Sequence, residues 1–120
     1  MRAQWISPDS ADWRSFISES THDFYHLPEY VRLDARHQGG QPSAFLAEEE
    51  GHRLLVPLIV RPVCLSPQGR VDCYDAIDPY GYGGPLFHAG PSGDPVTFLR
   101  AAISRLVHEL RARRVVSAFF

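Results

Sequence analysis

A loop rich in glycine and tyrosine is the part of the sequence best suited to contact a ligand. Tyr80 and Tyr82 alternate with Gly81 and Gly83 in a segment that two prolines bracket. Glycine permits a positive φ or a close approach of two backbones, and proline fixes φ. We therefore predict one defined loop shape, with Tyr80, Tyr82, Gly81 and Gly83 as substrate-binding residues. The alternative is a rigid turn whose tyrosines pack against the domain.

Carboxylates lead into this loop. Asp72, Asp75 and Asp78 recur at every third position, whereas a calcium-binding loop needs ligands at alternate positions and a distal glutamate. Asp75 ends a predicted strand beside the loop, where a carboxylate could accept a proton from an amine or a hydroxyl. Asp78 precedes a proline, which is typical of a turn. We predict Asp75 as a substrate-binding residue and Asp78 as a turn residue.

The histidines do not form a recognisable metal site. His22 and His26 are four residues apart, but no glutamate follows His22 in the metalloprotease pattern and no third ligand is evident. We expect no bound metal, and we expect His52, His88 and His108 to be solvated or turn residues. No arrangement of Ser, His and Asp or of Cys and His indicates a nucleophile, so no catalytic residue is assigned.

The composition describes one domain, residues 1–120, with ordinary apolar content and a net charge of −2. The sequence has no basic tail that would indicate a nucleic-acid target, and none of its apolar runs is long enough to span a membrane. The start of the chain lacks the apolar run of a signal peptide, so we expect a cytoplasmic protein. Reduced cysteines are then expected, although a turn at 67–69 would place Cys64 and Cys73 opposite each other. The absence of Lys and Asn is typical of a GC-rich bacterial genome.

The pattern of apolar and turn residues predicts an α/β (α+β) domain with the order β-α-α-β-β-β-α-β and a mixed, largely antiparallel sheet. Pro57 interrupts one predicted strand and indicates an edge position or a bulge. The expected strands are 3–6, 42–48, 52–63, 71–77 and 115–120, and the expected helices follow Ser10, Leu27 and Asp94.

The last predicted helix has a good N-cap in Asp94 and a good first residue in Pro95. One apolar stripe along it is expected to pack in the core: Val96, Leu99, Ala102, Ile103, Leu106 and Leu110. The apolar strand Val115–Phe120 follows. It could pair with another copy of the chain or with a partner, which would make the protein a non-enzymatic binding or assembly module.

Four segments, 23–30, 45–48, 54–62 and 78–85, together resemble the N-terminal half of FemAB-like proteins, a branch of the GNAT acyltransferase superfamily. That family includes enzymes that add amino acids to peptidoglycan precursors. The resemblance implies a GNAT-like partial domain that binds the acceptor or serves as a scaffold. It also implies a truncated chain, inactive alone, whose missing second half would bind the acyl donor.

The donor site of the superfamily is an Arg/Gln-x-x-Gly-x-Gly/Ala loop, whose backbone N–H groups and following helix hold the pyrophosphate of acetyl-CoA. The segment most similar to this motif, 36–41, does not match it at the last position, and it ends a predicted helix instead of beginning one. Asp94 also places a negative charge where a phosphate would bind. We expect no cofactor on this chain, while the resemblance implies acetyl-CoA or another acyl donor for the full-length family.

The resemblance implies an acceptor that is an amine-bearing small molecule or a cell-wall precursor. Peptidoglycan-bridge enzymes carry an aromatic residue and then a lysine near the phosphates of the precursor. Here Tyr30 is followed by Arg32, and arginine can bind a phosphate through two hydrogen bonds. Arg32 and Tyr25, both in or beside the segment 23–30, complete the predicted substrate-binding set.

Overall fold

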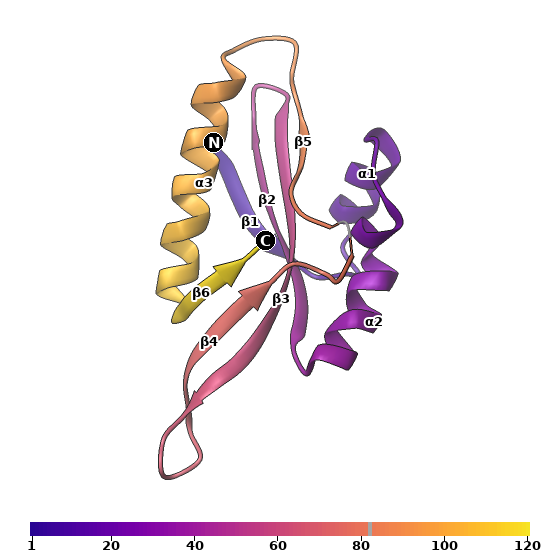
Figure 1. Ribbon diagram of the computed structural model, residues 1–120. Coiled ribbons are helices and arrows are strands. Elements are labelled where there is room, and N and C mark those ends of the chain that lie inside the picture. The colour runs from indigo at the N-terminus through magenta and orange to yellow at the C-terminus, as the bar shows by residue number, and fades with distance from the viewer. Residues whose placement is uncertain (82) are drawn as a thin grey trace.

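A mixed sheet of six strands forms the centre of the computed structural model, which describes residues 1–81 and 83–120, with Cys64 and Leu65 described by their backbone only (Figure 1). The elements in chain order are β1 (Arg2–Ile6), α1 (Ala11–Glu19), the short 3₁₀ helix η1 (Phe24–His26), α2 (Pro28–Gln38), β2 (Gln41–Glu49), β3 (His52–Leu65), β4 (Val71–Ile77), β5 (Leu86–His88), α3 (Pro95–Ala112) and β6 (Val115–Phe119).

The strand order is β1-β2-β3-β4-β6, and β5 pairs with β3 beside the end of β4. All pairs are antiparallel except β4 with β6, which are parallel and are joined through α3. The predicted mixed, largely antiparallel sheet is therefore confirmed. The predicted element order is incomplete, because it lacks η1 and the three-residue strand β5, both too short to show a periodic pattern.

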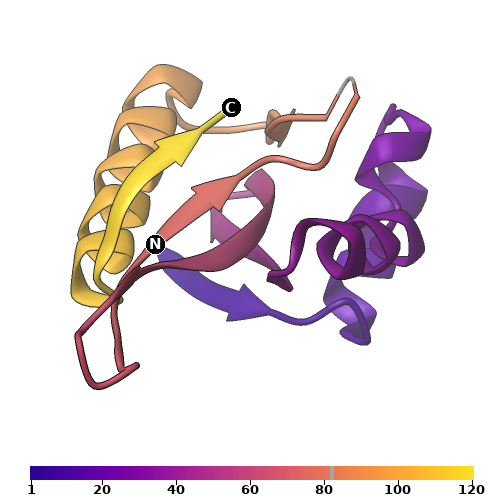
Figure 2. The same cartoon turned by 60° about the horizontal axis from the view of Figure 1, so that its bottom comes forward.

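Helices cover both faces of the sheet, with α1 and α2 on one face and α3 on the other (Figure 2). Alternate residues of β2 supply the two cores, as its alternating pattern predicts. Phe45 and Ala47 pack in the cluster that includes α3, whereas Ala44 and Leu46 pack in the cluster that includes Trp13 of α1.

Helix α3 buries a strict four-residue repeat against the sheet, made of Phe98, Ala102, Leu106 and Leu110. The predicted stripe is partly wrong, because Val96 is 54% exposed and Ile103 is 53% exposed. Phe98 takes the core position beside β3 instead. The predicted N-cap is confirmed, since the carboxylate of Asp94 accepts hydrogen bonds from the backbone N–H groups of Val96 and Thr97.

The ladder along one side of β3 is interrupted around Pro57. β3 pairs with β4 up to Ile59↔Ile77 and resumes with β5 at Leu55↔Leu86. On this side, residues 56–58 of β3 therefore have no ladder partner among the described strands. The segment between β4 and β5, residues 78–85, leaves the sheet here as a loop. Pro57 has no N–H group to donate to a ladder. The bulge predicted at Pro57 is not found, because Pro57 pairs with Ala44 of β2 in a ladder without a register shift. On its other side no described strand pairs with residues 56–58, so Pro57 has one open ladder side, as the predicted edge position requires, although β3 as a whole lies inside the sheet.

The hairpin of β3 and β4 brings the two cysteine backbones directly opposite each other, Cys64↔Cys73. Cys73 is disulfide-bonded, so the expectation of a reduced thiol is wrong for this residue. The sequence already indicated that a turn at 67–69 would place the two cysteines opposite each other, and opposed strand positions are close enough for a disulfide. The expectation of a reduced thiol gave more weight to the cell compartment than to this geometry. Within the described residues, no helix is both long and apolar enough to cross a membrane.

Candidate functional site

The loop between β4 and β5 is fixed at Tyr80 by two hydrogen bonds to α2. The backbone N–H of Tyr80 donates to Oδ2 of Asp34 at 2.9 Å, and the hydroxyl of Tyr30 donates to the carbonyl of Tyr80 at 2.7 Å. The Tyr80 side chain is nevertheless 75% exposed. The backbone of Tyr80 is therefore held by α2 while its ring is exposed.

Tyr30 and Asp34 can grip the same peptide because they lie four residues apart on α2 and so share one face of the helix. Asp34 is almost fully buried. Burial, and secondarily the negative charge of Asp34, raises the pKa of Tyr30, so its hydroxyl keeps its proton and remains a donor at neutral pH. The row of polar side chains that Tyr30 and Asp34 form continues one turn further to Gln38, the last residue of α2.

Gly81 is required where the loop meets Tyr25. A Cβ atom at Gly81 would lie only 2.3 Å from Cε1 of the Tyr25 ring, and the φ of Gly81 is +110°, which side chains rarely adopt. The Tyr25 ring also meets Phe24 and Tyr30, with ring centroids 5.9 and 5.3 Å apart. Close packing of the Tyr25 ring on Gly81 therefore fixes the loop directly after Tyr80. Gly83 lies where a Cβ would approach the carbonyl of Pro79 at 3.1 Å.

His26 ties the same loop to the first helices. Its backbone carbonyl accepts from Nε1 of the buried Trp13 at 3.0 Å, and its Nδ1 accepts from the N–H of Asp23 at 2.9 Å. Its ring is also hydrogen-bonded to the backbone of Gly84. Burial lowers the pKa of His26, and the bonds to Asp23 and Gly84 oppose this only in part. A neutral imidazole at this position is therefore part of the folded structure.

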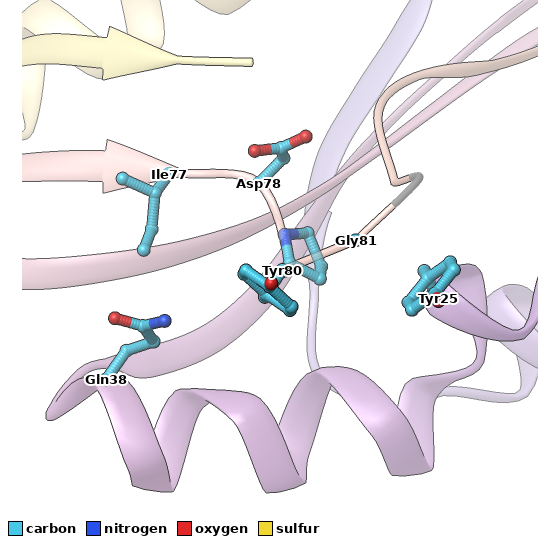
Figure 3. A pocket seen from close by; sticks show the side chains of 7 residues that line it. Tyr25, Gln38, Ile77, Asp78, Tyr80 and Gly81 are labelled. Atoms are coloured by element: carbon cyan, nitrogen blue, oxygen red, sulfur yellow. The ribbon is translucent and has the colours of Figure 1, made fainter.

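A cleft of about 520 Å³ opens beside the fixed loop (Figure 3). Figure 3 shows the Tyr80 ring between Gln38 and Ile77 on one side and Tyr25 on the other, above helix α2. The lining residues are Tyr25, Gln38, Ile77, Asp78, Pro79, Tyr80 and Gly81. The cleft thus combines two aromatic rings with one amide, and Asp78 lines it from the loop with its carboxylate directed away from the Tyr80 ring (Figure 3). Aromatic rings of this kind suit a cationic or amine-bearing ligand.

Asp78 is the charged group of the cleft. Its backbone N–H donates to the carbonyl of Phe119 at 3.0 Å, which links the loop to the end of β6. Burial raises the pKa of Asp78, and the nearby charge of Asp34 adds to that effect. A carboxylate destabilised in this way gains more from a cation than a fully solvated one does. Asp78 was predicted as a turn residue, and the structure places it among the lining residues.

Asp75 and Arg32 do not line the cleft. The carboxylate of Asp75 is bound by Nε and Nη2 of Arg61, its direct neighbour across the β3–β4 ladder, at 2.9 and 2.6 Å. Arg32 lies on α2 and forms an ion pair with Asp9. Both side chains have a partner that the linear sequence does not reveal. Tyr82, also predicted to bind substrate, lies outside the described residues.

Three residues of the site were missed, namely Tyr30, Asp34 and Gln38. Their spacing of four is the signal that could have found them, since it places three polar side chains in one row beside the buried Val31 and Ala35. The prediction that His52 is solvated is wrong, because it is 2% exposed and its Nδ1 accepts from the N–H of Gly90 at 2.8 Å. In the part of the chain that the structure describes, no group of three or more His, Cys, Asp or Glu residues could hold a metal ion.

No protein-family model, curated protein or solved structure matches this chain significantly. What the loop and the cleft can bind therefore follows from their own geometry.

The buried His26 predicts a loss of stability in mild acid. Its folded-state pKa is lower than that of the unfolded chain, about 6.5, so the unfolded state binds the proton first. The contribution of His26 to stability is complete above about pH 6.5 and is lost as the pH falls through that value. We expect the urea midpoint to drop between about pH 7.5 and about pH 5.5, and His26→Gln to flatten that drop.

The matched control is His108→Gln on the exposed side of α3, which should leave the pH dependence unchanged. The readout is the slope of stability against pH, so a uniform loss of stability in His26→Gln does not affect it. A slope in His26→Gln as steep as in the natural chain would contradict the assignment.

Proposed function

We propose that this chain is the acceptor-binding part of a GNAT-type N-acyltransferase, of the kind that FemAB-like proteins represent. In this proposal the cleft beside Tyr80 holds an amine-bearing acceptor, and the acyl donor is bound outside this chain. The observation that carries the proposal is the exposed Tyr80 ring on a hydrogen-bonded backbone, in a cleft that the half-buried Asp78 also lines.

An amine fits this cleft for electrostatic reasons. An ammonium group beside Asp78 would offset the unfavourable burial of that carboxylate, and the ring faces of Tyr25 and Tyr80 attract cations. The Gln38 amide adds a neutral donor and acceptor for the rest of the ligand. Holding the amine in one orientation is the main contribution that an acceptor site makes to acyl transfer. The bound ammonium group must first lose a proton to a base, and the free amine then attacks the acyl carbonyl while the thiol of the acyl donor leaves.

The N-terminus of α3 supports a donor site elsewhere. The N–H groups of Val96 and Thr97, which could hold a pyrophosphate at the start of a helix, already donate to Asp94. The Thr97 hydroxyl, and then these two N–H groups, lowers the pKa of Asp94, so the carboxylate is charged at neutral pH. A negative charge at this helix start repels the phosphates of a coenzyme A thioester.

The proposal predicts selective binding of a small amine. We expect benzylamine to shift the backbone NMR signals of Tyr80 and Gly81 in a saturable manner, while benzyl alcohol, of the same shape but neutral, binds much more weakly. Asp78→Asn should raise the Kd for benzylamine by about tenfold, because it removes the opposite charge. Binding should weaken as the pH falls toward about 4, since protonation of Asp78 also removes that charge.

Asp72→Asn is the matched control, since Asp72 is exposed on β4, the strand that leads to Asp78, and does not line the cleft. Equal binding of the alcohol and the amine, or equal losses in Asp72→Asn and Asp78→Asn, would contradict an amine site. A titration with acetyl-CoA tests the other half of the proposal, and micromolar binding by this chain would contradict a donor site outside it.

A second candidate function, an assembly module, is favoured by the exposed apolar surface of β6. Among the described strands, β6 pairs with β4 alone. Val116 is 67% exposed, Phe119 76% and Phe120 54%. An edge strand with such side chains can pair with a second copy.

Size-exclusion chromatography with light scattering separates the two functions. An assembly module predicts a discrete dimer in the natural chain that Val116→Lys converts to a monomer, because an edge lysine opposes strand pairing. Ser104→Lys on the exposed face of α3 would be the control for added charge. A monomeric natural chain would contradict the assembly function and leave the acceptor site unaffected.

A further inference from the structure

A second cleft, of about 480 Å³, lies on the opposite face of the sheet, at the end of α3. It is lined by Gln41, Ser43, Val60, Tyr74, Ala112, Arg113 and Arg114. None of these residues lines the cleft beside Tyr80. Its volume falls within the range of small-molecule sites in proteins, which run from about 300 to about 1,000 Å³.

The charge of this cleft has one sign. Its polar lining consists of two guanidinium groups, the hydroxyls of Ser43 and Tyr74 and the amide of Gln41, with no carboxylate among them. Six other arginines form ion pairs with carboxylates: Arg2, Arg14, Arg32, Arg53, Arg61 and Arg105. Within the described residues, Arg113 and Arg114 form no such ion pair, as is also true of Arg36, Arg70, Arg100 and Arg111, and the charge of Arg113 acts on Glu109, one turn earlier in the chain. Two arginines beside hydroxyl donors, in a lining without a carboxylate, are a usual means of binding an oxyanion.

The backbone holds both arginines in place. The N–H of Arg113 donates to the carbonyls of Glu109 and Leu110 at 3.1 and 3.2 Å, which closes the end of α3. Arg114 has a φ of +60°, and its carbonyl accepts from the N–H of Tyr74 at 3.0 Å. The turn from α3 into β6 is therefore built around these two residues and joins them to the strand that carries Tyr74.

The Arg113 side chain is also oriented. Its Cζ lies 4.6 Å from the centroid of the Trp5 ring, so the guanidinium is placed over an aromatic face. The N–H groups at the edge of a stacked guanidinium remain able to donate to an anion. A side chain that is already positioned loses less conformational freedom when it binds.

We propose that this cleft is a binding site for the phosphate or carboxylate group of a small molecule. Arg113 and Arg114 bind the anion, the hydroxyls of Tyr74 and Ser43 donate to it, and the remainder of the molecule lies along Val60 and the Tyr74 ring. The inference is independent of the amine cleft, because the two sites lie on opposite faces of the sheet and share no lining residue.

Sodium pyrophosphate and tricarballylate test the site as NMR titrants, with sodium chloride added to keep the ionic strength constant. We expect at least one of them to shift the backbone signals of Tyr74, Arg113 and Arg114 in a saturable manner, without moving that of Tyr80. Arg113→Gln and Arg114→Gln should each raise the Kd by about fivefold or more, since each removes a charge-assisted pair of hydrogen bonds.

Arg100→Gln is the matched control, because Arg100 lies on the same helix, is exposed and does not line the cleft. Saturation by pyrophosphate alone or by tricarballylate alone identifies the preferred anion and supports the site. The proposal is overturned if neither anion saturates, or if Arg100→Gln weakens binding as much as the two cleft variants do.

Discussion

The loop 78–85 connects β4 to β5 and is longer than the three residues of β3, 56–58, that separate the two ladders. Its backbone groups therefore need hydrogen-bond partners outside the sheet. Helix α2 supplies them at Tyr80, through the carboxylate of the buried Asp34 and the hydroxyl of Tyr30. Much of the site depends on this pair of bonds. They hold the loop over α2 and leave the Tyr80 ring exposed to solvent. They also fix the part of the cleft wall that the loop residues Asp78 and Tyr80 form.

Three further contacts hold the loop in one position. Tyr25 packs on Gly81 so closely that no side chain fits, His26 holds the backbone of Gly84, and Asp78 is bonded to the end of β6. Elements from both ends of the chain thus meet at one loop. A site built in this way presents a pre-formed surface, which reduces the conformational entropy lost when a ligand binds.

The fold was largely predictable because most elements are long enough to show a period. Helix α2 begins at Pro28, directly after Leu27 as expected, and ends at Gln38, where Gly39 caps it in the left-handed conformation. The strand expected at 42–48 is present as β2, and Pro57 lies where one side of β3 has no ladder partner among the described strands. β5 escaped notice because three residues show no pattern, and Phe98 displaced Val96 from the core because the helix phase is set by the sheet.

The site was predicted at the level of the loop and not of its partners. Tyr80 and Gly81 line the cleft as expected, while Asp75 is held by Arg61, because cross-strand register decides which carboxylate meets which cation. Asp34 and Gln38 were missed, since their role arises from a contact with residues more than forty positions away. Local sequence can indicate that a loop has a fixed shape, but the groups that fix it come from the tertiary fold.

Hydrogen exchange of the Tyr80 amide tests most directly whether the loop is held in this way. The bond from this N–H to Asp34 predicts slow exchange, and Asp34→Ala should remove the protection at Tyr80 while amides in the centre of β3 keep theirs. Exchange of the Tyr80 amide at the rate of an unprotected peptide in the natural chain would contradict a pre-formed loop, and with it the proposal that the cleft is ready to receive an acceptor.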